Sequence, residues 1–69
     1  MNRREYAQVR AELRGDMVGC MLMVSKAACA LSRDELGTAD DFMRAAEQFL
    51  KSYNAKISKW HNQMEMNDE

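Results

Sequence analysis

The chain has 69 residues, a formal net charge of −1, two cysteines and no proline. A chain this short forms one domain with a modest core, and such domains usually rely on disulfides, a metal or a second copy for stability. The charge argues against a general nucleic-acid binder, because those proteins are normally basic. On one helix Cys20 and Cys29 would lie about 13 Å apart, too far for a disulfide. Reduced thiols in the cytoplasm are therefore expected, and association is the expected route to stability.

Two helices are predicted, over residues 3–36 and 39–64, because good helix formers dominate and no segment alternates like a strand. Gly37 is expected to close the first helix in the left-handed conformation, and Thr38 to cap the second. The short connection predicts an antiparallel hairpin, so the fold class is all-α with a single domain over 1–69.

The ends of these helices leave one alternative open. The first helix could stop near Leu31, because Ser32 and Glu35 have the spacing of a capping box. After the second helix, residues 65–69 are expected to form a frayed acidic tail.

Apolar residues recur every three or four positions on both predicted helices, with an eleven-residue repeat that predicts a nearly straight or weakly right-handed hairpin. Folding at Gly37 would place Val24 opposite Phe49 and Met17 opposite Ile57. The stripe on the first helix is Tyr6, Val9, Leu13, Met17, Cys20, Val24, Ala28 and Leu31; that on the second is Phe42, Ala46, Phe49, Tyr53, Ile57, Trp60 and Met64.

The segment GDMVGCMLMVSKAACAL, residues 15–31, is apolar on more sides than one packing stripe requires. Such a surface marks an interface, so a homodimer in a four-helix bundle is expected. Residues 17–31 are too short to span a membrane, which takes about 20 apolar residues, and they include Lys26. The residues expected at the dimer interface are Ala11, Gly15, Val18, Gly19, Leu22, Met23 and Cys29.

No catalytic, cofactor or metal site is expected. The single histidine, His61, has Glu65 four residues away, but a metal site normally needs three or four ligands. Charges instead separate along the hairpin, and the acidic turn could engage a basic surface of a partner. The acidic residues expected to contact that partner are Asp34, Glu35, Asp40 and Asp41.

The stretch MNRREYAQVRAELRGDMVGCMLMV, with the tail SKWHNQMEMNDE, resembles the small anti-quorum-sensing proteins of bacteriophages. The resemblance implies a non-enzymatic helical dimer in the host cytoplasm. It also implies that the dimer binds and inhibits a LuxR-type quorum-sensing transcription regulator and the ATPase that drives type IV pilus assembly. Two other classes remain open: a small helical nucleic-acid-associated or transcription-regulating protein, and a structural or chaperone-like phage component.

Overall fold

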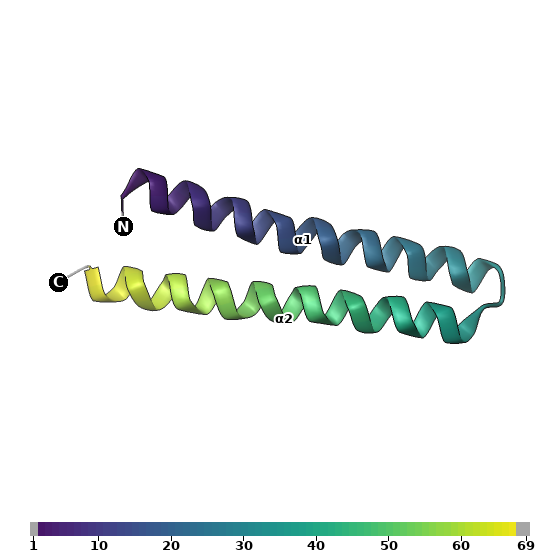
Figure 1. The fold of residues 1–69 in the computed structure, drawn as a ribbon. Coiled ribbons are helices and arrows are strands. Elements are labelled where there is room, and N and C mark those ends of the chain that lie inside the picture. Colours follow the sequence, from purple (N-terminus) through teal and green to yellow (C-terminus); the bar gives the residue numbers. More distant parts are fainter. Residues whose placement is uncertain (1, 68–69) are drawn as a thin grey trace.

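Two long antiparallel helices make up the fold (Figure 1). The computed structural model describes residues 2–67, and side chains for residues 2–64. Helix α1 spans Arg3–Ser32 and helix α2 spans Leu36–Asn67. They lie side by side along their length and form a rod of 54 × 17 × 10 Å. The predicted all-α helical hairpin is therefore confirmed.

The first turn of α1 is held by a side-chain cap. The Asn2 side chain accepts a hydrogen bond of 2.8 Å from the Glu5 backbone N–H, and its amide donates back to the Glu5 carboxylate at 3.3 Å. The first of these bonds satisfies the Glu5 backbone N–H, which has no partner within the helix, and the second joins the two side chains. Glu5 also places a negative charge at the positive end of the helix dipole.

The turn between the helices is centred on Asp34, which takes the left-handed conformation with φ 59°. The Asp34 N–H donates to the Leu31 carbonyl at 3.0 Å, and the Glu35 N–H donates to the Ala30 carbonyl at 2.9 Å. These two bonds define a Schellman motif, which terminates a helix by satisfying its last carbonyls. Asp34 fills the position that glycine usually occupies, since aspartate tolerates this conformation better than most residues.

Several predicted boundaries were wrong. Helix α1 ends at Ser32, close to the alternative end at Leu31 and not at residue 36. Gly37 and Thr38 lie inside the first turn of α2, because Asp34 has already closed α1. Helix α2 also continues beyond residue 64 to Asn67, so the expected frayed tail is helical as far as the structure describes it. Residues 68–69 lie outside the described chain.

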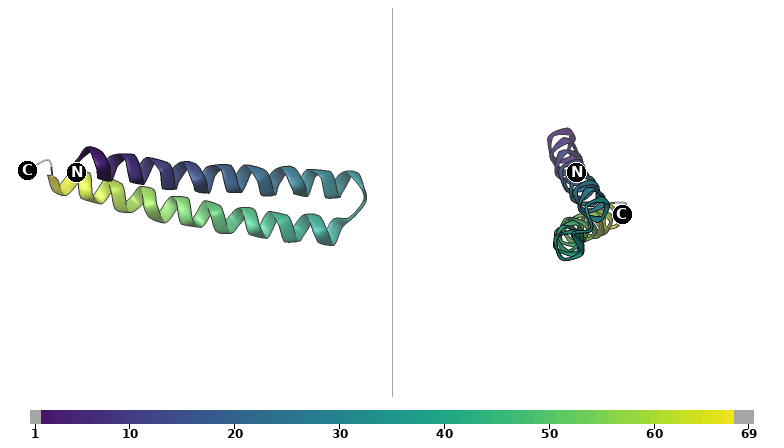
Figure 2. Two further views of the ribbon diagram at one scale, coloured as in Figure 1. Left: turned by 45° about the horizontal axis from the view of Figure 1, so that its top comes forward. Right: turned by 90° about the vertical axis from the view of Figure 1, so that its right-hand side faces the viewer.

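The side chains between the helices follow a seven-residue pattern. Their spacing alternates between three and four, which is typical of a left-handed coiled coil and not of the predicted eleven-residue repeat. The end-on view shows the two helices inclined to each other (Figure 2). The buried and half-buried core positions are Val9, Leu13, Asp16, Cys20, Met23, Ala27 and Ala30 on α1, and Ala39, Phe42, Ala46, Phe49, Tyr53, Lys56 and Trp60 on α2.

The register of the helices also differs from the prediction. Phe49 lies against Gly19, and not opposite Val24. Because the turn lies before Gly37, each residue of α2 meets an earlier residue of α1. Met17 and Val24 are consequently exposed, at 51% and 42% of their surface. Small and polar residues replace them in the core.

Candidate protein-interaction surface

The hairpin buries few large side chains. Its fully packed apolar residues are four alanines, Ala27, Ala30, Ala39 and Ala46, each 2–4% exposed. Large apolar side chains remain outside, namely Tyr6, Met17, Val18, Met21, Leu22, Val24, Leu31, Leu36, Met43, Leu50 and Met64. Contiguous exposed apolar surface of this kind marks interaction sites. The candidate site is therefore a surface and not a cleft.

One part of this surface runs along a single side of the hairpin, and we call it the apolar side face. Six of its eight residues follow a core position by one, and the other two, Leu36 and Met64, continue the same seven-residue spacing, so all eight turn about 100° away from the core. In two antiparallel helices this rotation turns the side chains of both helices toward the same side of the hairpin. The apolar side face consists of Met17, Val24 and Leu31 on α1 and of Leu36, Met43, Leu50 and Met64, with the half-buried Ile57, on α2.

The second part lies on α1, on the side away from α2, and we call it the outer face. From Met17 to Ser32 the only charged residue is Lys26, which lies over the Phe42 ring at 5.8 Å instead. The corresponding positions of α2 are polar, as in Arg44, Lys51 and Ser58. The exposed residues of the outer face are Ala11, Gly15, Val18, Met21, Leu22, Ala28 and Cys29.

Five residues of the expected dimer interface, Ala11, Gly15, Val18, Leu22 and Cys29, lie together on this outer face. Their contact with a second copy stays a prediction.

The other two residues of that expected interface lie elsewhere. Gly19 faces α2, and a Cβ atom on it would meet the Phe49 ring. Met23 is half-buried at a core position. Gly19 therefore already packs against Phe49 within the hairpin, and the contact of Gly19 and Met23 with a second copy stays a prediction.

A carboxylate lies in the core, where sequence reasoning did not place one. The Asp16 side chain is only 11% exposed and accepts hydrogen bonds from Ser52 Oγ and Lys56 Nζ, both at 2.9 Å. The hydrogen bond from Lys56 holds the pKa of the Asp16 carboxyl below its ordinary value, and this outweighs the opposite effect of burial. The sequence does contain a signal for the core position of Asp16, because it lies three residues after Leu13 and four before Cys20, the spacing of core residues on a helix.

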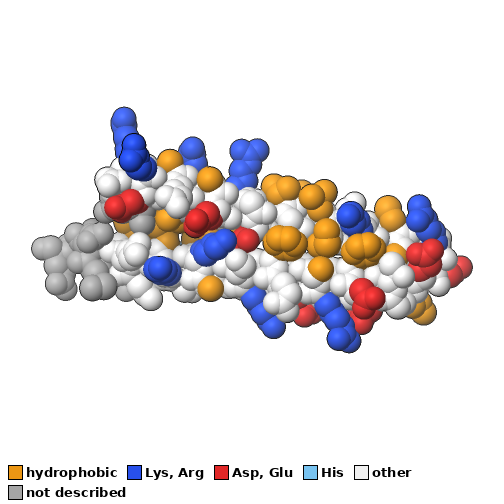
Figure 3. Space-filling model, viewed as in Figure 1, with side chains coloured by type: hydrophobic (Ala, Val, Ile, Leu, Met, Phe, Trp, Pro, Cys, Tyr) orange, Lys and Arg blue, Asp and Glu red, His pale blue; other side chains and the backbone are white. Residues whose placement is uncertain are grey.

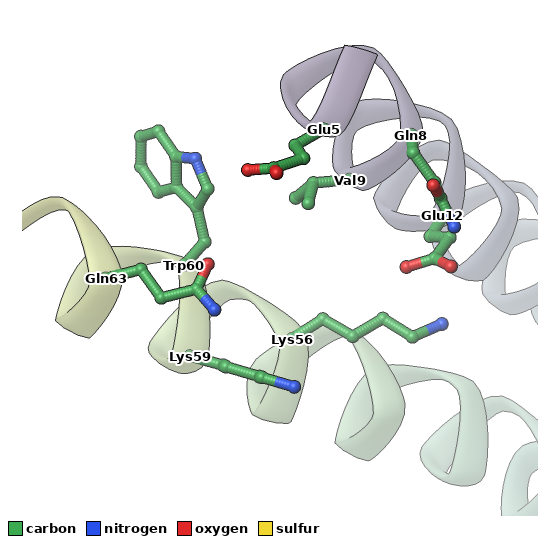
Figure 4. A pocket seen from close by; sticks show the side chains of 8 residues that line it. All are labelled: Glu5, Gln8, Val9, Glu12, Lys56, Lys59, Trp60 and Gln63. Atoms are coloured by element: carbon green, nitrogen blue, oxygen red, sulfur yellow. The ribbon is translucent and has the colours of Figure 1, made fainter. Parts of the chain in front are cut away.

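A groove of about 420 Å³ opens between the helices near the chain termini (Figure 4). Glu5, Val9 and Glu12 of α1 border it on one side and Lys56, Lys59 and Trp60 of α2 on the other, and the Trp60 side chain projects toward Glu5. The Trp60 Nε1 is buried without a hydrogen-bond partner among the described residues. The groove is lined by Glu5, Gln8, Val9, Glu12, Lys56, Lys59, Trp60 and Gln63. Among the side chains described, those of residues 2–64, no cluster of three metal-ligating groups accompanies it.

The acidic residues expected to contact a partner gather at the turn end. Asp34, Glu35, Asp40 and Asp41 are all exposed, and Asp40 pairs with Arg44 at 3.0 Å. In Figure 3 hydrophobic side chains gather over α1 between the middle of the rod and the turn end, and charged side chains lie at both ends and along the α2 edge of the visible face. The turn end is thus negative, and the charge-poor surface begins beside it.

Helix α1 is also long and apolar enough, by length and composition only, to cross a membrane. Core helices of soluble proteins meet the same criteria, so this property alone assigns no location. No protein-family model, curated protein or solved structure matches the chain. Functional inference therefore rests on the surfaces of the hairpin.

Proposed function

We propose that this protein has no catalytic activity and acts by binding another protein through the outer face of α1. The observation that carries the proposal is the exposed apolar surface around Val18, Met21 and Leu22, which are 45%, 65% and 54% exposed and which Arg10 and Arg14 border toward the start of α1. Burying such side chains contributes about 25 cal/mol per Å² of apolar surface removed from water. Methionine is common on binding surfaces because its flexible thioether adapts to irregular partners.

The partner site that suits this surface is an apolar groove. An amphipathic helix typically binds such a groove with anchors spaced three, four and seven residues apart. On the outer face Met21 and Leu22 follow Val18 by three and four residues, and Cys29 follows Leu22 by seven. The acidic turn then adds an electrostatic contribution, since Asp40 and Asp41 would accelerate encounter with a basic surface nearby.

The proposed partners are the host targets implied by the sequence resemblance, a LuxR-type regulator or the pilus assembly ATPase, and the proposed outcome is their inhibition in the bacterial cytoplasm. Because the proposed function involves no catalytic turnover, one bound inhibitor would be needed for each site that it blocks on either target. Inhibition would follow from occlusion of a surface that the regulator or ATPase needs for its own assembly or for DNA.

The experiment is a direct binding measurement with the two purified candidate targets. The Leu22→Glu variant is expected to lose binding at least about a hundredfold, because it buries an unpaired charge. Ser58→Glu is the matched control, since it adds the same charge to the exposed polar side of α2. Equal binding by Leu22→Glu and Ser58→Glu would reject the outer face as the site.

A second measurement separates this proposal from a nucleic-acid-associated function. DNA binding through phosphates weakens steeply as salt rises, whereas an apolar protein contact does not. If neither target binds and salt-sensitive DNA binding is found instead, the inhibitor proposal is wrong. Reversing Asp40 and Asp41 to lysine should slow association with a basic partner and leave the helix content unchanged.

A further inference from the structure

We infer that the partner presents an acidic surface to Arg10 and Arg14, which border the outer face of α1 and which we call the arginine pair. This inference rests on the proposed function and deepens it, because it names the chemistry that the partner carries beside its apolar groove. Arg14 lies about one helical turn before Val18, so one partner can reach both the charged and the apolar residues.

The arginine pair lies beside a depression of about 680 Å³ over the first half of α1. An alanine side chain ends at Cβ and glycine has none, so the small residues of this depression leave room for side chains of another protein. Val18 lines the depression as well, which joins the arginine pair to the apolar part of the outer face. The lining residues, all of them exposed, are Ala7, Arg10, Ala11, Arg14, Gly15 and Val18.

The charges of α1 are separated by side. Glu5 and Glu12 line the groove between the helices, and Asp16 lies in the core. Arg3 and the arginine pair fall instead within about 40° of one another on the outer side, at about 100° per residue. In Figure 3 blue side chains project from the upper edge of the first half of α1, whereas red ones lie lower, toward α2. A partner that covers this part of the outer side therefore meets positive charge.

The arginine pair forms no ion pair with the described side chains, whose two ion pairs join Arg44 to Asp40 and Lys56 to Asp16. The two arginines are four residues apart, a spacing at which like charges on a helix repel each other. The stability of the hairpin therefore gives no reason for this pair. Carboxylates of a partner would supply the counter-charge, because a guanidinium group binds a carboxylate through two parallel hydrogen bonds.

An acidic protein surface fits these residues better than nucleic acid does. Protein interfaces typically combine an apolar centre with a polar rim, and they are enriched in arginine and methionine. Val18, Met21 and Leu22 supply such a centre, and the arginine pair supplies one edge of the rim. A phosphate backbone would leave the apolar centre uncovered. Nucleic-acid-binding proteins are also normally basic, whereas this chain has a net charge of −1.

The test uses the isotope-labelled full chain and two synthetic peptides, so it depends on neither proposed target. Each peptide has about 20 residues, long enough to be helical, with leucines along one face. The acidic peptide carries two glutamates four residues apart at one end of that face, and the neutral peptide carries glutamines there. The acidic peptide should shift the amide NMR signals of Ala7, Ala11 and Gly15, with an affinity at least about tenfold above that of the neutral peptide. This difference should shrink as salt is added.

Arg14→Glu should lower the affinity for the acidic peptide at least about tenfold. Arg14 is exposed, so circular dichroism should show unchanged helix content. Lys51→Glu is the matched control, because it makes the same charge reversal on the polar outer side of α2, and it should bind like the wild type. Equal affinity for the two peptides, or equal losses in the two variants, would overturn the inference. Larger shifts at the same amides with duplex DNA than with the acidic peptide would overturn it as well.

The outcomes separate this inference from the proposed function. If a LuxR-type regulator or the pilus ATPase binds the outer face while the chain does not distinguish the two peptides, the proposed function stands and the inference is wrong. If the acidic peptide binds through Arg14 and neither target binds, the proposed targets are wrong and the inference stands.

Discussion

Gly19 lies directly against the ring of Phe49. A Cβ atom built on Gly19 would come within 2.5 Å of Phe49 Cε1, which is closer than real carbon atoms approach. A glycine inside a helix costs about 1 kcal/mol relative to alanine. Here that cost is offset by the packing of an aromatic ring against bare backbone, and the contact fixes the register of the two helices.

Gly19→Ala is therefore expected to destabilise the protein. The new methyl group must displace the Phe49 ring, and overpacking of this kind typically costs about 1–3 kcal/mol. The substitution also gains about 1 kcal/mol of helix propensity. The lower end of the overpacking range equals this gain, and the upper end exceeds it. We expect a lower midpoint in urea denaturation, with the slope unchanged.

Gly15→Ala is the matched control in the same helix. Nothing lies within 4 Å of a Cβ atom at Gly15, so the substitution changes helix propensity alone. It should stabilise the protein by about 1 kcal/mol. If Gly19→Ala and Gly15→Ala raise stability equally, Phe49 does not pack against Gly19 as described.

The Asp16 carboxylate should make stability depend on pH. Its pKa is lowered in the folded state by the hydrogen bond from Lys56, so the carboxylate contributes stability above its unfolded pKa. That contribution is lost as pH falls through the folded pKa, in the acid range below about pH 4. Denaturation midpoints measured from pH 7 to pH 2 should fall, and Asp16→Asn should reduce the slope of this fall. An identical pH profile for Asp16→Asn would contradict the assignment.

Asp34→Gly should stabilise the turn. The left-handed conformation costs a non-glycine residue about 1–2 kcal/mol, less for aspartate, and a negative charge at a helix C-terminus is unfavourable. A gain of up to about 1 kcal/mol is expected in thermal or chemical unfolding. Asp34→Ala keeps a Cβ atom in the strained conformation and should not show this gain. A melting temperature that is equal for both variants would argue against the strained turn.

Trp60→Ala should destabilise the open end of the hairpin. Truncation of a fully buried Trp costs about 3–5 kcal/mol, and about half of this is expected at a half-buried position. Trp60→Phe keeps most of the apolar contact and removes an indole N–H that has no partner among the described residues, so it should cost less. Equal losses for both variants would mean that the indole N–H contributes to stability. Circular dichroism during thermal melting measures both.

The sequence by itself determined the class of fold. Composition without proline, apolar residues every three or four positions and a short polar connection are local signals, and they were sufficient to predict two antiparallel helices. They also marked the excess of apolar surface on the first helix around Val18 and Leu22. Helix propensity and periodicity act within a few residues, so they can be read without knowing what the chain folds against.

Only the tertiary structure decided which residues face one another. Glycine was the expected turn residue, yet Asp34 adopts the left-handed conformation and shifts the register by several positions. That shift brings Gly19 to Phe49 and Asp16 to Lys56, and it leaves Met17, Val24 and Leu31 outside. An antiparallel pair selects its register from the sum of all contacts, and here small and polar residues permit the close approach of the helices. A prediction that ranks single residues by size places the large apolar residues in the core instead. In this register those residues lie on the surface.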